Sequence, residues 1–490
     1  MITLVYPADG PLEHFIPLGI ASVGAFLQCH GVRVKVLDMR FHQLSDLKQA
    51  AKTSQFISFS AMSLLMNKAL RYAQVCKQAN PQVKIIFGGP HPSIFPRETL
   101  KNKQVDFVVI GEGELTTLDL VRHSDRSEKV EGIGFKKRRK VIITRPRKLV
   151  EDLDTLPFAD RDLFPVQAIL KKTPYWPCLT PYPQLSMIST RGCPYNCAYC
   201  QPTLRKIFGN VTRRRSPQRT VDEMEYLSRR YQPASIFMAD DLFTAEREWT
   251  LATCREIRKR GLEKKLIWEC ESRANTFTPE IARELKKSGC YMVWFGTESY
   301  CQNTLNTLRK GTTVEQNLRS LKLCQKYKLL SLEQLMVGNP AETLEDLYQT
   351  LETSQKVKAD VTAVAVTTPV PGTDLYNLLK EQNLLLTKRL DDLGSCFKGK
   401  MKFRLRYDKK HRDLVYDQLK VGGEISLRFL LTRDYYRAIF FKRMKSHVVT
   451  GNWLAILVDW GRIFYRASPA WVVRPLNKMV DSIKELALKS

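Results

Sequence analysis

Three closely spaced cysteines constrain this chain more than any other feature. Cys193, Cys197 and Cys200 stand at the spacing C-x3-C-x2-C, directly after the apolar, strand-like run 185–188. A glycine and a proline flank the first cysteine, so we expect all three thiols on one short loop past a strand. Soft thiolates at such a spacing suit an iron–sulfur cluster or zinc. A structural zinc site closes with four ligands, and no Cys or His follows at a fitting distance. The loop therefore indicates a three-thiolate site with one open position.

The residues around these cysteines are more specific than the spacing. Residues 186–202 read Ser-Met-Ile-Ser-Thr-Arg-Gly-Cys-Pro-Tyr-Asn-Cys-Ala-Tyr-Cys-Gln-Pro. This segment resembles the cluster loop of the radical S-adenosylmethionine (SAM) superfamily. The resemblance implies a 4Fe–4S cluster on Cys193, Cys197 and Cys200, with SAM bound at the iron that lacks a cysteine. It also implies reductive cleavage of SAM to a deoxyadenosyl radical, with Tyr199 packed on the adenine ring.

Strand-like and helix-like stretches alternate through the first 120 residues. Such alternation predicts a doubly wound parallel sheet, in which ligands bind beyond the carboxyl ends of the strands. The expected strands are 1–6, 32–38, 56–60, 83–87 and 107–110. The small or polar residues at their carboxyl ends are Ser58, Ser60, Gly88, Gly89, Gly111 and Glu112.

The order of these segments resembles the cobalamin-binding domain of one radical SAM branch. The matching segments are Pro17-Leu-Gly19, Asp38, Ser58–Ser60, Gly88-Gly-Pro-His-Pro92 and Gly111-Glu-Gly-Glu114. The resemblance implies a cobalamin site in residues 1–135, lined by the six strand-end residues named above. Many cobalamin domains carry Asp-x-His-x-x-Gly, whose His binds cobalt, but this chain has Asp38-Met-Arg-Phe-His42. We therefore expect cobalamin bound without a His ligand to cobalt.

A second alternating unit is expected at 185–385, after a linker at 136–184 that contains a basic β-hairpin. Six apolar runs are separated by helical patterns, which predicts a partial (β/α)6 TIM-type barrel. The functional groups of such barrels lie at the carboxyl ends of the strands. The expected strands are 185–188, 235–238, 266–269, 291–295, 331–337 and 361–366.

Polar residues follow the strands of this predicted barrel. The resemblance implies that Asp240, Asp241 and Glu298 bind the amino and ribose groups of SAM. It also implies that the turn from Gly338 to Glu342 lies at the adenine. Arg273 suits the SAM carboxylate through a charge-assisted hydrogen bond. For a single carboxylate such as Asp241, a helix cap or a surface charge is the alternative.

The region 386–490 is expected to be basic and helical, without the βα rhythm. Its segment 424–466 combines basic and aromatic residues at helical spacing, which indicates either an anionic membrane surface or a cap over the barrel mouth. The whole chain carries a formal net charge of +28, which favours anionic partners. The sequence contains no recognised nucleic-acid-binding module, so a nucleic acid is a less favoured partner than a membrane.

The chain of 490 residues is long enough for two or three domains. Twelve cysteines are too few for a disulfide scaffold, and a thiolate cluster needs reduced thiols, so we expect a cytoplasmic protein. We expect no signal peptide and no membrane-spanning helix, because the chain opens on a strand-like run and no apolar run reaches about 18 residues.

The resemblance predicts a cobalamin-dependent radical SAM methyltransferase that acts on an unactivated carbon. A cyclisation, an oxidation or another radical outcome on the same scaffold is the alternative. A cofactor-based sensor is the non-enzyme alternative, but a sensor needs no SAM site. The expected partners are a small-molecule substrate and a reductase, flavodoxin or ferredoxin that donates electrons. A lipid or isoprenoid substrate is favoured over a tetrapyrrole or another natural product.

Overall fold

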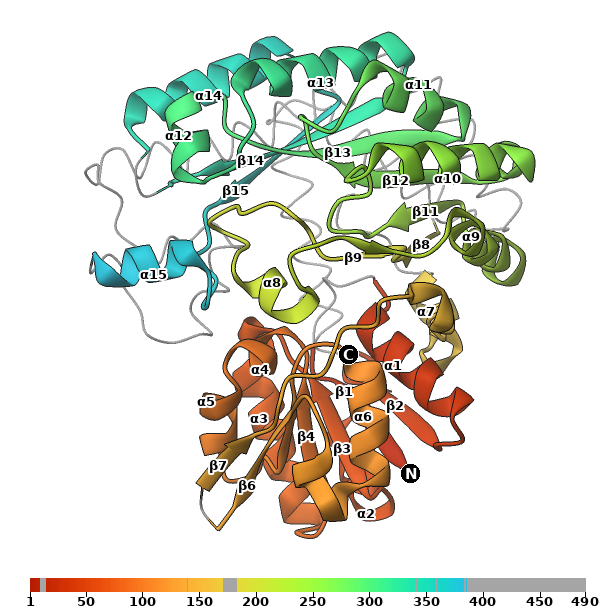
Figure 1. Cartoon of the computed structure of the whole chain (residues 1–490), viewed down its shortest axis with the longest axis vertical. Helices are drawn as coiled ribbons and strands as arrows, with labels where there is room; N and C mark the ends of the chain where they lie inside the picture. The colour runs from red at the N-terminus through yellow and green to blue at the C-terminus, as the bar shows by residue number, and fades with distance from the viewer. Residues whose placement is uncertain are drawn as a thin grey trace, which may run out of the picture.

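A computed structural model of the chain describes residues 1–8, 15–138, 140–170, 183–339, 342–357, 359–382 and 385. These residues form two α/β units, the N-terminal one below and the C-terminal one above in Figure 1. The region 386–490, with its segment 424–466, lies outside the described residues. In the described part, no helix is long and apolar enough to span a membrane.

The N-terminal unit is built on a sheet whose first five strands are parallel, as predicted. The strand order β2-β1-β3-β4-β5 changes direction at β1 and β3, where doubly wound sheets bind ligands. The strands are β1 (Ile2–Tyr6), β2 (Val34–Asp38), β3 (Phe56–Ser60), β4 (Lys84–Gly88) and β5 (Phe107–Val109).

Helices cover both faces of this sheet, which is why its strands read as continuous apolar runs. α1 (Leu18–Cys29) packs beside α6 (Gly113–Arg122) in one hydrophobic cluster. α2 (Leu44–Thr53) packs beside α3 (Met66–Ala79) in another. The shorter elements are η1 (Ser63–Leu65), α4 (Pro90–Ile94), α5 (Pro96–Lys101) and η2 (Ser124–Lys129).

The basic hairpin extends this sheet instead of forming part of a free linker. β6 (Ile133–Lys137) pairs antiparallel with β5, and β7 (Lys140–Ile143) pairs with β6. Ile133 and Phe135 are buried, and the centroid of the Phe135 ring lies 6.4 Å from that of Phe107. The pairing with β6 covers the edge of β5, which would otherwise leave backbone groups unpaired. The sheet therefore continues to Ile143, past the boundary at 135 that the sequence suggested.

An extended strap at 144–170 joins the two units. It contains η3 (Leu153–Thr155), η4 (Arg161–Leu163) and α7 (Val166–Leu170). Arg161 is fully buried, and its Nη2 donates to the backbone oxygen of Ser186 at 2.6 Å and to Glu223 at 3.1 Å. Removing one partner of such a buried pair is strongly destabilising, so this contact fixes the strap to the barrel.

The C-terminal unit is a six-stranded parallel sheet in the order β15-β14-β13-β12-β11-β8, which confirms the partial (β/α)6 barrel (Figure 1). Its strands are β8 (Gln184–Met187), β11 (Ser235–Met238), β12 (Ile267–Ser272), β13 (Cys290–Glu298), β14 (Leu330–Val337) and β15 (Val361–Val366). The helices after them are α9 (Pro217–Tyr231), α10 (Arg247–Lys259), α11 (Pro279–Lys287), α13 (Val314–Tyr327) and α14 (Leu344–Val357). Short elements complete the unit: β9 (Thr190–Arg191), α8 (Thr203–Phe208), β10 (Arg213–Arg214), η5 (Leu262–Lys264), α12 (Gln302–Thr307) and α15 (Asp374–Glu381).

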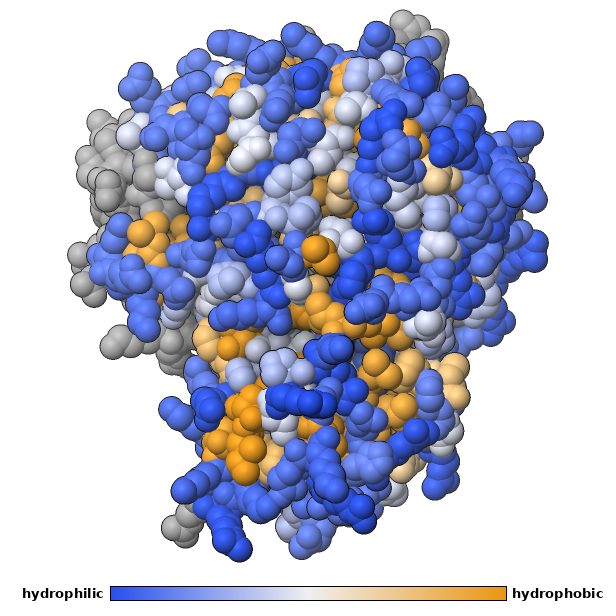
Figure 2. All heavy atoms as spheres, in the orientation of Figure 1, coloured by the Kyte–Doolittle hydropathy of each residue, from blue (hydrophilic) through white to orange (hydrophobic). Residues whose placement is uncertain are grey.

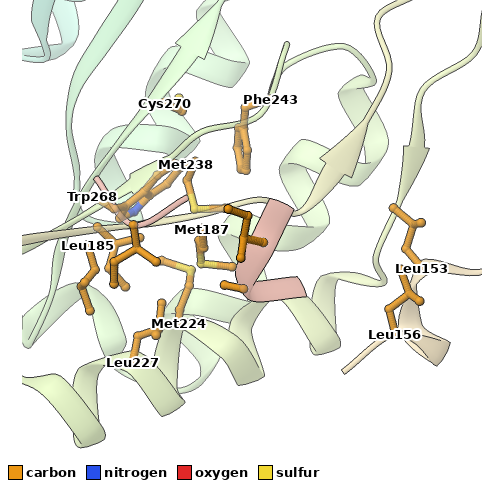
Figure 3. Packing of buried hydrophobic residues seen from close by; sticks show 14 of the residues in the cluster. Leu153, Leu156, Leu185, Met187, Met224, Leu227, Met238, Phe243, Trp268 and Cys270 are labelled. Atoms are coloured by element: carbon orange, nitrogen blue, oxygen red, sulfur yellow. The ribbon is translucent and has the colours of Figure 1, made fainter. Parts of the chain in front are cut away.

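Large side chains fill the space between this sheet and its helices. Figure 3 shows Met187, Met224 and Met238 packed near Trp268 and Phe243. The Trp268 indole is fully buried, and its N–H donates to the Ser288 carbonyl oxygen at 2.8 Å. A core packed on the helix side leaves the carboxyl ends of the strands free to carry polar groups.

Candidate active site between the two units

A cavity of about 470 Å³ lies between the two units. The carboxyl ends of strands from both sheets contribute to it, including Ser58 and Gly88 from one unit and Thr190 and Asp241 from the other. Figure 2 shows hydrophobic residues gathered across this junction. Residues predicted for cobalamin and Asp241 of the predicted SAM site therefore line one cavity.

The lower wall of the cavity contains all six residues predicted for cobalamin: Ser58, Ser60, Gly88, Gly89, Gly111 and Glu112. Gly89 has φ +92°, and a Cβ atom there would lie 3.1 Å from the Ser60 hydroxyl and from the Ala61 backbone nitrogen. A side chain at this position would therefore be strained and crowded. The glycines leave the wall open to close backbone approach, which fits a broad, flat ligand.

Neither histidine near the cobalamin motif lines the described part of this cavity. The Nδ1 atom of His42 lies 2.9 Å from the Asp38 carbonyl oxygen. His91 is buried, with Nδ1 3.0 Å from the Ser63 hydroxyl, and burial lowers its pKa to about 4. Both rings serve local contacts, so binding of cobalamin without a His ligand stays our prediction.

The cysteine loop begins after β8 and borders the upper wall. Cys197 is buried, while Cys193 and Cys200 are half-buried. Burial, followed by the neighbouring Cys197, raises the pKa of Cys200 to about 12, so the free thiol is protonated and iron must displace the proton. Among the described residues, no three Cys, His, Asp or Glu side chains are gathered at the distances of a single metal ion. Binding of a four-iron cluster by the three thiols of this loop stays our prediction.

Tyr199 of this loop meets Glu298 and Lys310. The tyrosine hydroxyl donates to Glu298 Oε1 at 2.8 Å. Lys310 Nζ donates to the Tyr199 hydroxyl oxygen and to Glu298 Oε1, each at 2.9 Å. Burial and the Glu298 carboxylate raise the pKa of Tyr199 well above its usual value. Glu298 has φ +61°, and a Cβ atom at Gly296 would lie 2.6 Å from its carboxylate, so Gly296 makes room for this folded-back side chain.

Lys310 is a site residue that the sequence analysis missed. It lies between α12 and the start of α13, in Arg309-Lys-Gly-Thr-Thr313. This polar segment with one glycine has the composition of an ordinary surface loop. The Lys310 side chain is nevertheless buried against Glu298. A lysine just before a helix cap is a weak signal, because only the folded chain brings it to the cysteine loop.

Arg273 lies against the cysteine loop from the end of β12. Its Nη1 donates to the Cys197 sulfur at 3.4 Å, and its guanidinium carbon lies 3.8 Å from the centroid of the Tyr195 ring. Its Nε and Nη2 atoms are buried and have no hydrogen-bond partner in the described part of the chain. Buried donors need partners, so these two N–H groups fit an incoming carboxylate.

The two neighbouring aspartates have different positions. Asp240 is buried, and it accepts hydrogen bonds from the backbone nitrogens and hydroxyls of Ser189 and Thr190 at 2.5–3.0 Å. Burial raises its pKa to about 6. Asp241 instead lines the cavity, and burial raises its pKa as well. Asp240 therefore holds the backbone that leads into the cysteine loop, while Asp241 faces the cleft.

The turn after β14 is closed by its own carboxylate. Glu342 is buried and accepts from the backbone nitrogens of Gly338 at 2.6 Å and Asn339 at 3.2 Å. Burial raises its pKa to about 7. Gly338, at φ +78°, allows the reversal. Glu342 thus shapes the turn.

An ion network, which the sequence analysis also missed, connects the units beside the cavity. Arg191, two residues before the first loop cysteine, donates to Glu112 at 2.8 Å and to Glu114 at 2.6 Å. Arg213 donates to Glu112 at 3.0 Å, and the Ser22 hydroxyl donates to Glu114 at 2.6 Å. Glu112, predicted for the cobalamin site, therefore also anchors the cysteine loop to the N-terminal unit.

Two protein-family models match the chain in the same order as its units. The B12 binding domain matches residues 12–121, and the radical SAM superfamily matches residues 187–353. Among curated proteins, an uncharacterized methyltransferase of Pyrococcus horikoshii is 31% identical over 380 residues, which cover 76% of this chain and 80% of that protein. The anaerobic magnesium-protoporphyrin IX monomethyl ester cyclase of Rubrivivax gelatinosus is 28% identical over 389 residues, which cover 75% of this chain and 66% of that protein.

Solved structures share the fold at low identity. The radical SAM methyltransferase TsrM of Kitasatospora setae superposes with a TM-score of 0.66 at 18% identity, over 78% of this chain and 74% of that chain. The cobalamin-dependent SAM radical enzyme OxsB gives a TM-score of 0.70 at 17% identity, over 92% of this chain and 72% of that chain. The family models, the archaeal relative and the two-unit fold agree with the resemblance of the cysteine loop and the strand ends. The chain belongs to the cobalamin-binding radical SAM enzymes, the family that contains these methyltransferases.

Proposed function

We propose that this enzyme methylates an unactivated carbon of a hydrophobic small molecule, held in the cleft between the two units. The observation that supports this function is the shared cavity: the glycine- and serine-lined strand ends of one unit face the entry to the cysteine loop of the other. When bound, a 4Fe–4S cluster and SAM supply a carbon-centred radical, and cobalamin supplies a methyl group. The radical and the methyl group must both reach the same substrate carbon, so one shared cavity suits the reaction.

The predicted site residues of the barrel have distinct proposed roles. Cys193, Cys197 and Cys200 hold the cluster. The unpaired N–H groups of Arg273 bind the SAM carboxylate. Asp241 and Glu298 receive the amino and ribose groups of SAM, Tyr199 packs on its adenine, and the backbone of the turn at Gly338 borders that ring. Asp240 and Glu342 act through the backbone segments that they hold in place.

The proposed substrate class rests on the cleft and on relatives. Ile188 and Met62 line the cavity, and both are among the exposed large hydrophobic residues, at 37% and 44%. Relatives include the magnesium-protoporphyrin ester cyclase, a bacteriochlorophyllide d methyltransferase of Chlorobaculum tepidum and a hopanoid C-3 methylase of Methylococcus capsulatus. These names describe large hydrophobic substrates. A flavodoxin, a ferredoxin or their reductase is the proposed electron donor.

Product analysis after anaerobic reconstitution tests the function. The full chain would be supplied with iron, sulfide, cobalamin, SAM and a reductant, and incubated separately with magnesium-protoporphyrin IX monomethyl ester and with a hopanoid. Methylation predicts both deoxyadenosine and S-adenosylhomocysteine, with one methyl group added to the accepted probe. Deoxyadenosine with a closed ring in the porphyrin probe, and no S-adenosylhomocysteine, would establish the cyclase outcome instead.

We also propose that the basic, aromatic segment 424–466 brings the enzyme to an anionic membrane that carries the substrate. Basic residues near such a surface contribute about 1 kcal/mol each. Flotation with phosphatidylserine vesicles should show binding that weakens with salt, and truncation after Lys400 should remove it while cluster content stays unchanged. Equal flotation with neutral vesicles would contradict the proposal. The basic residues of the segment include Arg428, Arg433, Arg437, Lys442, Arg443 and Lys445.

A further inference from the structure

The guanidinium of Arg273 lies directly beside a sulfur atom of the cysteine loop. Its Nη1 is 3.4 Å from Cys197 Sγ, and both residues are buried, at 5% and 6% exposure. Arg273 follows β12, which is a central strand of the barrel sheet. The arginine is therefore the first residue after a central strand of the barrel.

Several contacts fix the guanidinium in this orientation. It stacks on the Tyr195 ring at 3.8 Å, and the hydroxyl of that ring accepts from the Asn275 amide at 3.3 Å. A Cβ atom at Gly311 would lie 3.3 Å from Arg273 Nη2, so a glycine there leaves the space that the guanidinium needs. Arginine is suited to such a site because its planar group stacks and donates at the same time.

We propose that Arg273 is a positioning residue that makes the bound cluster easier to reduce, through its hydrogen bond to the Cys197 sulfur and its positive charge. This inference rests on the proposed function, because it requires a cluster on the three cysteines. The step is the transfer of one electron from an external donor such as reduced flavodoxin to the cluster, and no bond of Arg273 breaks.

The physical reason is the charge of the reduced state. One added electron makes the cluster more negative, and hydrogen bonds to its sulfurs are among the factors that set the reduction potential. A buried positive charge acts more strongly than an exposed one, because the local dielectric is lower. Arg273 thus stabilises the reduced cluster more than the oxidised one. Its Nε and Nη2 groups, which face no protein partner in the described region, stay available for SAM.

The chain offers a matched control for this effect. Arg205 in α8 also donates to the cysteine loop, but its Nη2 contacts the Pro194 carbonyl oxygen at 3.1 Å and not a sulfur. Arg205→Gln therefore removes the same charge and one loop hydrogen bond while leaving the Cys197 contact in place. Arg273→Lys keeps the charge but loses the planar stack on Tyr195.

The test is a redox titration of the reconstituted full-length protein without SAM. The EPR signal of the reduced cluster measures the fraction of clusters that is reduced at each potential. We expect Arg273→Gln to lower the reduced-to-oxidised ratio at a fixed potential about tenfold, a shift of about 59 mV for one electron. Arg273→Lys should fall between this variant and the parent, and Arg205→Gln should match the parent. Iron and sulfide would be counted in every variant.

Three results would overturn the proposal while leaving the proposed function intact. One is a full cluster in Arg273→Gln at the parent potential. Another is a lower iron content in Arg273→Gln, with the remaining clusters titrating at the parent potential. Arg273 would then only hold the loop in place. An equal shift in Arg205→Gln would also overturn it, since the sulfur contact would not matter. If the parent itself binds no cluster, the proposed function fails as well.

Discussion

The two walls of the cleft are built from different chemistry. The wall from the N-terminal unit consists of glycines, serines and apolar side chains, and its acidic residues Glu112 and Glu114 pair with barrel arginines. The barrel contributes charged residues such as Arg215 and Asp241 to the cleft, and in the same unit Glu298 contacts Lys310 and Arg273 lies beside a cysteine sulfur.

This difference matches the ligands of the family. Cobalamin is broad and largely flat, so it needs backbone that can approach closely, as glycine allows. SAM is small and carries separate charged groups, so it needs charged partners that are already oriented. Orienting these partners has a cost: Asp240 and Glu342 are buried, and both carry raised pKa values. Variants of one wall should therefore affect one cofactor and spare the other.

The largest expected effect is in the barrel unit, from loss of a loop thiolate. Cys193→Ala, Cys197→Ala or Cys200→Ala should abolish cluster binding, because no other soft ligand replaces the lost sulfur. Iron and sulfide analysis after anaerobic reconstitution measures this effect. Cys301→Ala is the control, since this buried thiol contacts Asp346 at 2.9 Å and not the loop. Full cluster occupancy in Cys197→Ala would refute the cluster assignment.

The opposite effect is expected on the other wall. Gly89→Val should prevent cobalamin binding and leave the iron content unchanged, because a side chain there would meet Ser60 and Ala61. The absorption spectrum of bound corrinoid and an iron assay measure both quantities in one sample. Gly31→Val is the matched control, because Gly31 also has positive φ, at +78°, but faces open space. Equal corrinoid loss in both variants would mean that backbone strain, and not the wall, is responsible.

A smaller effect is expected for SAM. Glu298→Ala should keep the cluster and weaken SAM binding at least tenfold, because hydrogen bonds to charged groups are worth about 1.5–3 kcal/mol. Calorimetric titration of SAM into the reconstituted protein measures this affinity. Glu333→Ala is the comparison, since Glu333 is a buried acid of β14 bonded to Tyr300 at 2.6 Å. Unchanged SAM affinity in Glu298→Ala would assign Glu298 a structural role.

The smallest effect concerns the ion network that joins the walls. Burial alone would raise the pKa of Glu114, but Arg191 and Ser22 lower it below its ordinary value of 4.5. The stabilisation is therefore present above about pH 4.5 and is lost as the pH falls through the lower pKa of the folded state. The free energy of unfolding, measured with urea across this range, should decrease toward acid in the parent and less so in Glu114→Gln. Equal slopes in the two proteins would contradict this account.

The features that could be predicted from the sequence are those that depend on local patterns of residues. Alternating apolar runs were sufficient for both sheets, since each strand and helix is marked by its own periodicity and turn residues. The cysteine loop was recognisable because its ligands lie within eight residues. The strand-end glycines were also predictable, because a parallel sheet places them at one edge.

The sequence analysis missed relations between distant side chains. Lys310 reaches Glu298 only because β13 and the segment after α12 meet in the barrel, and Arg191 reaches Glu114 across 77 positions. Adjacent Asp240 and Asp241 were equivalent in sequence, but neighbouring side chains at a strand end point in different directions. The hairpin at 133–143 was placed in a linker because its pairing with β5 leaves no local signal.

Both cofactors of this family are expected to share one cleft in this protein. Pulsed EPR on the reconstituted full-length protein, with cob(II)alamin and the reduced cluster both present, measures the magnetic coupling between the two centres. We expect a clear dipolar coupling in the parent, which disappears in Gly89→Val and in Cys197→Ala because each variant lacks one centre. Two fully occupied centres without detectable coupling would contradict the account, because the cofactors would then lie in separate sites.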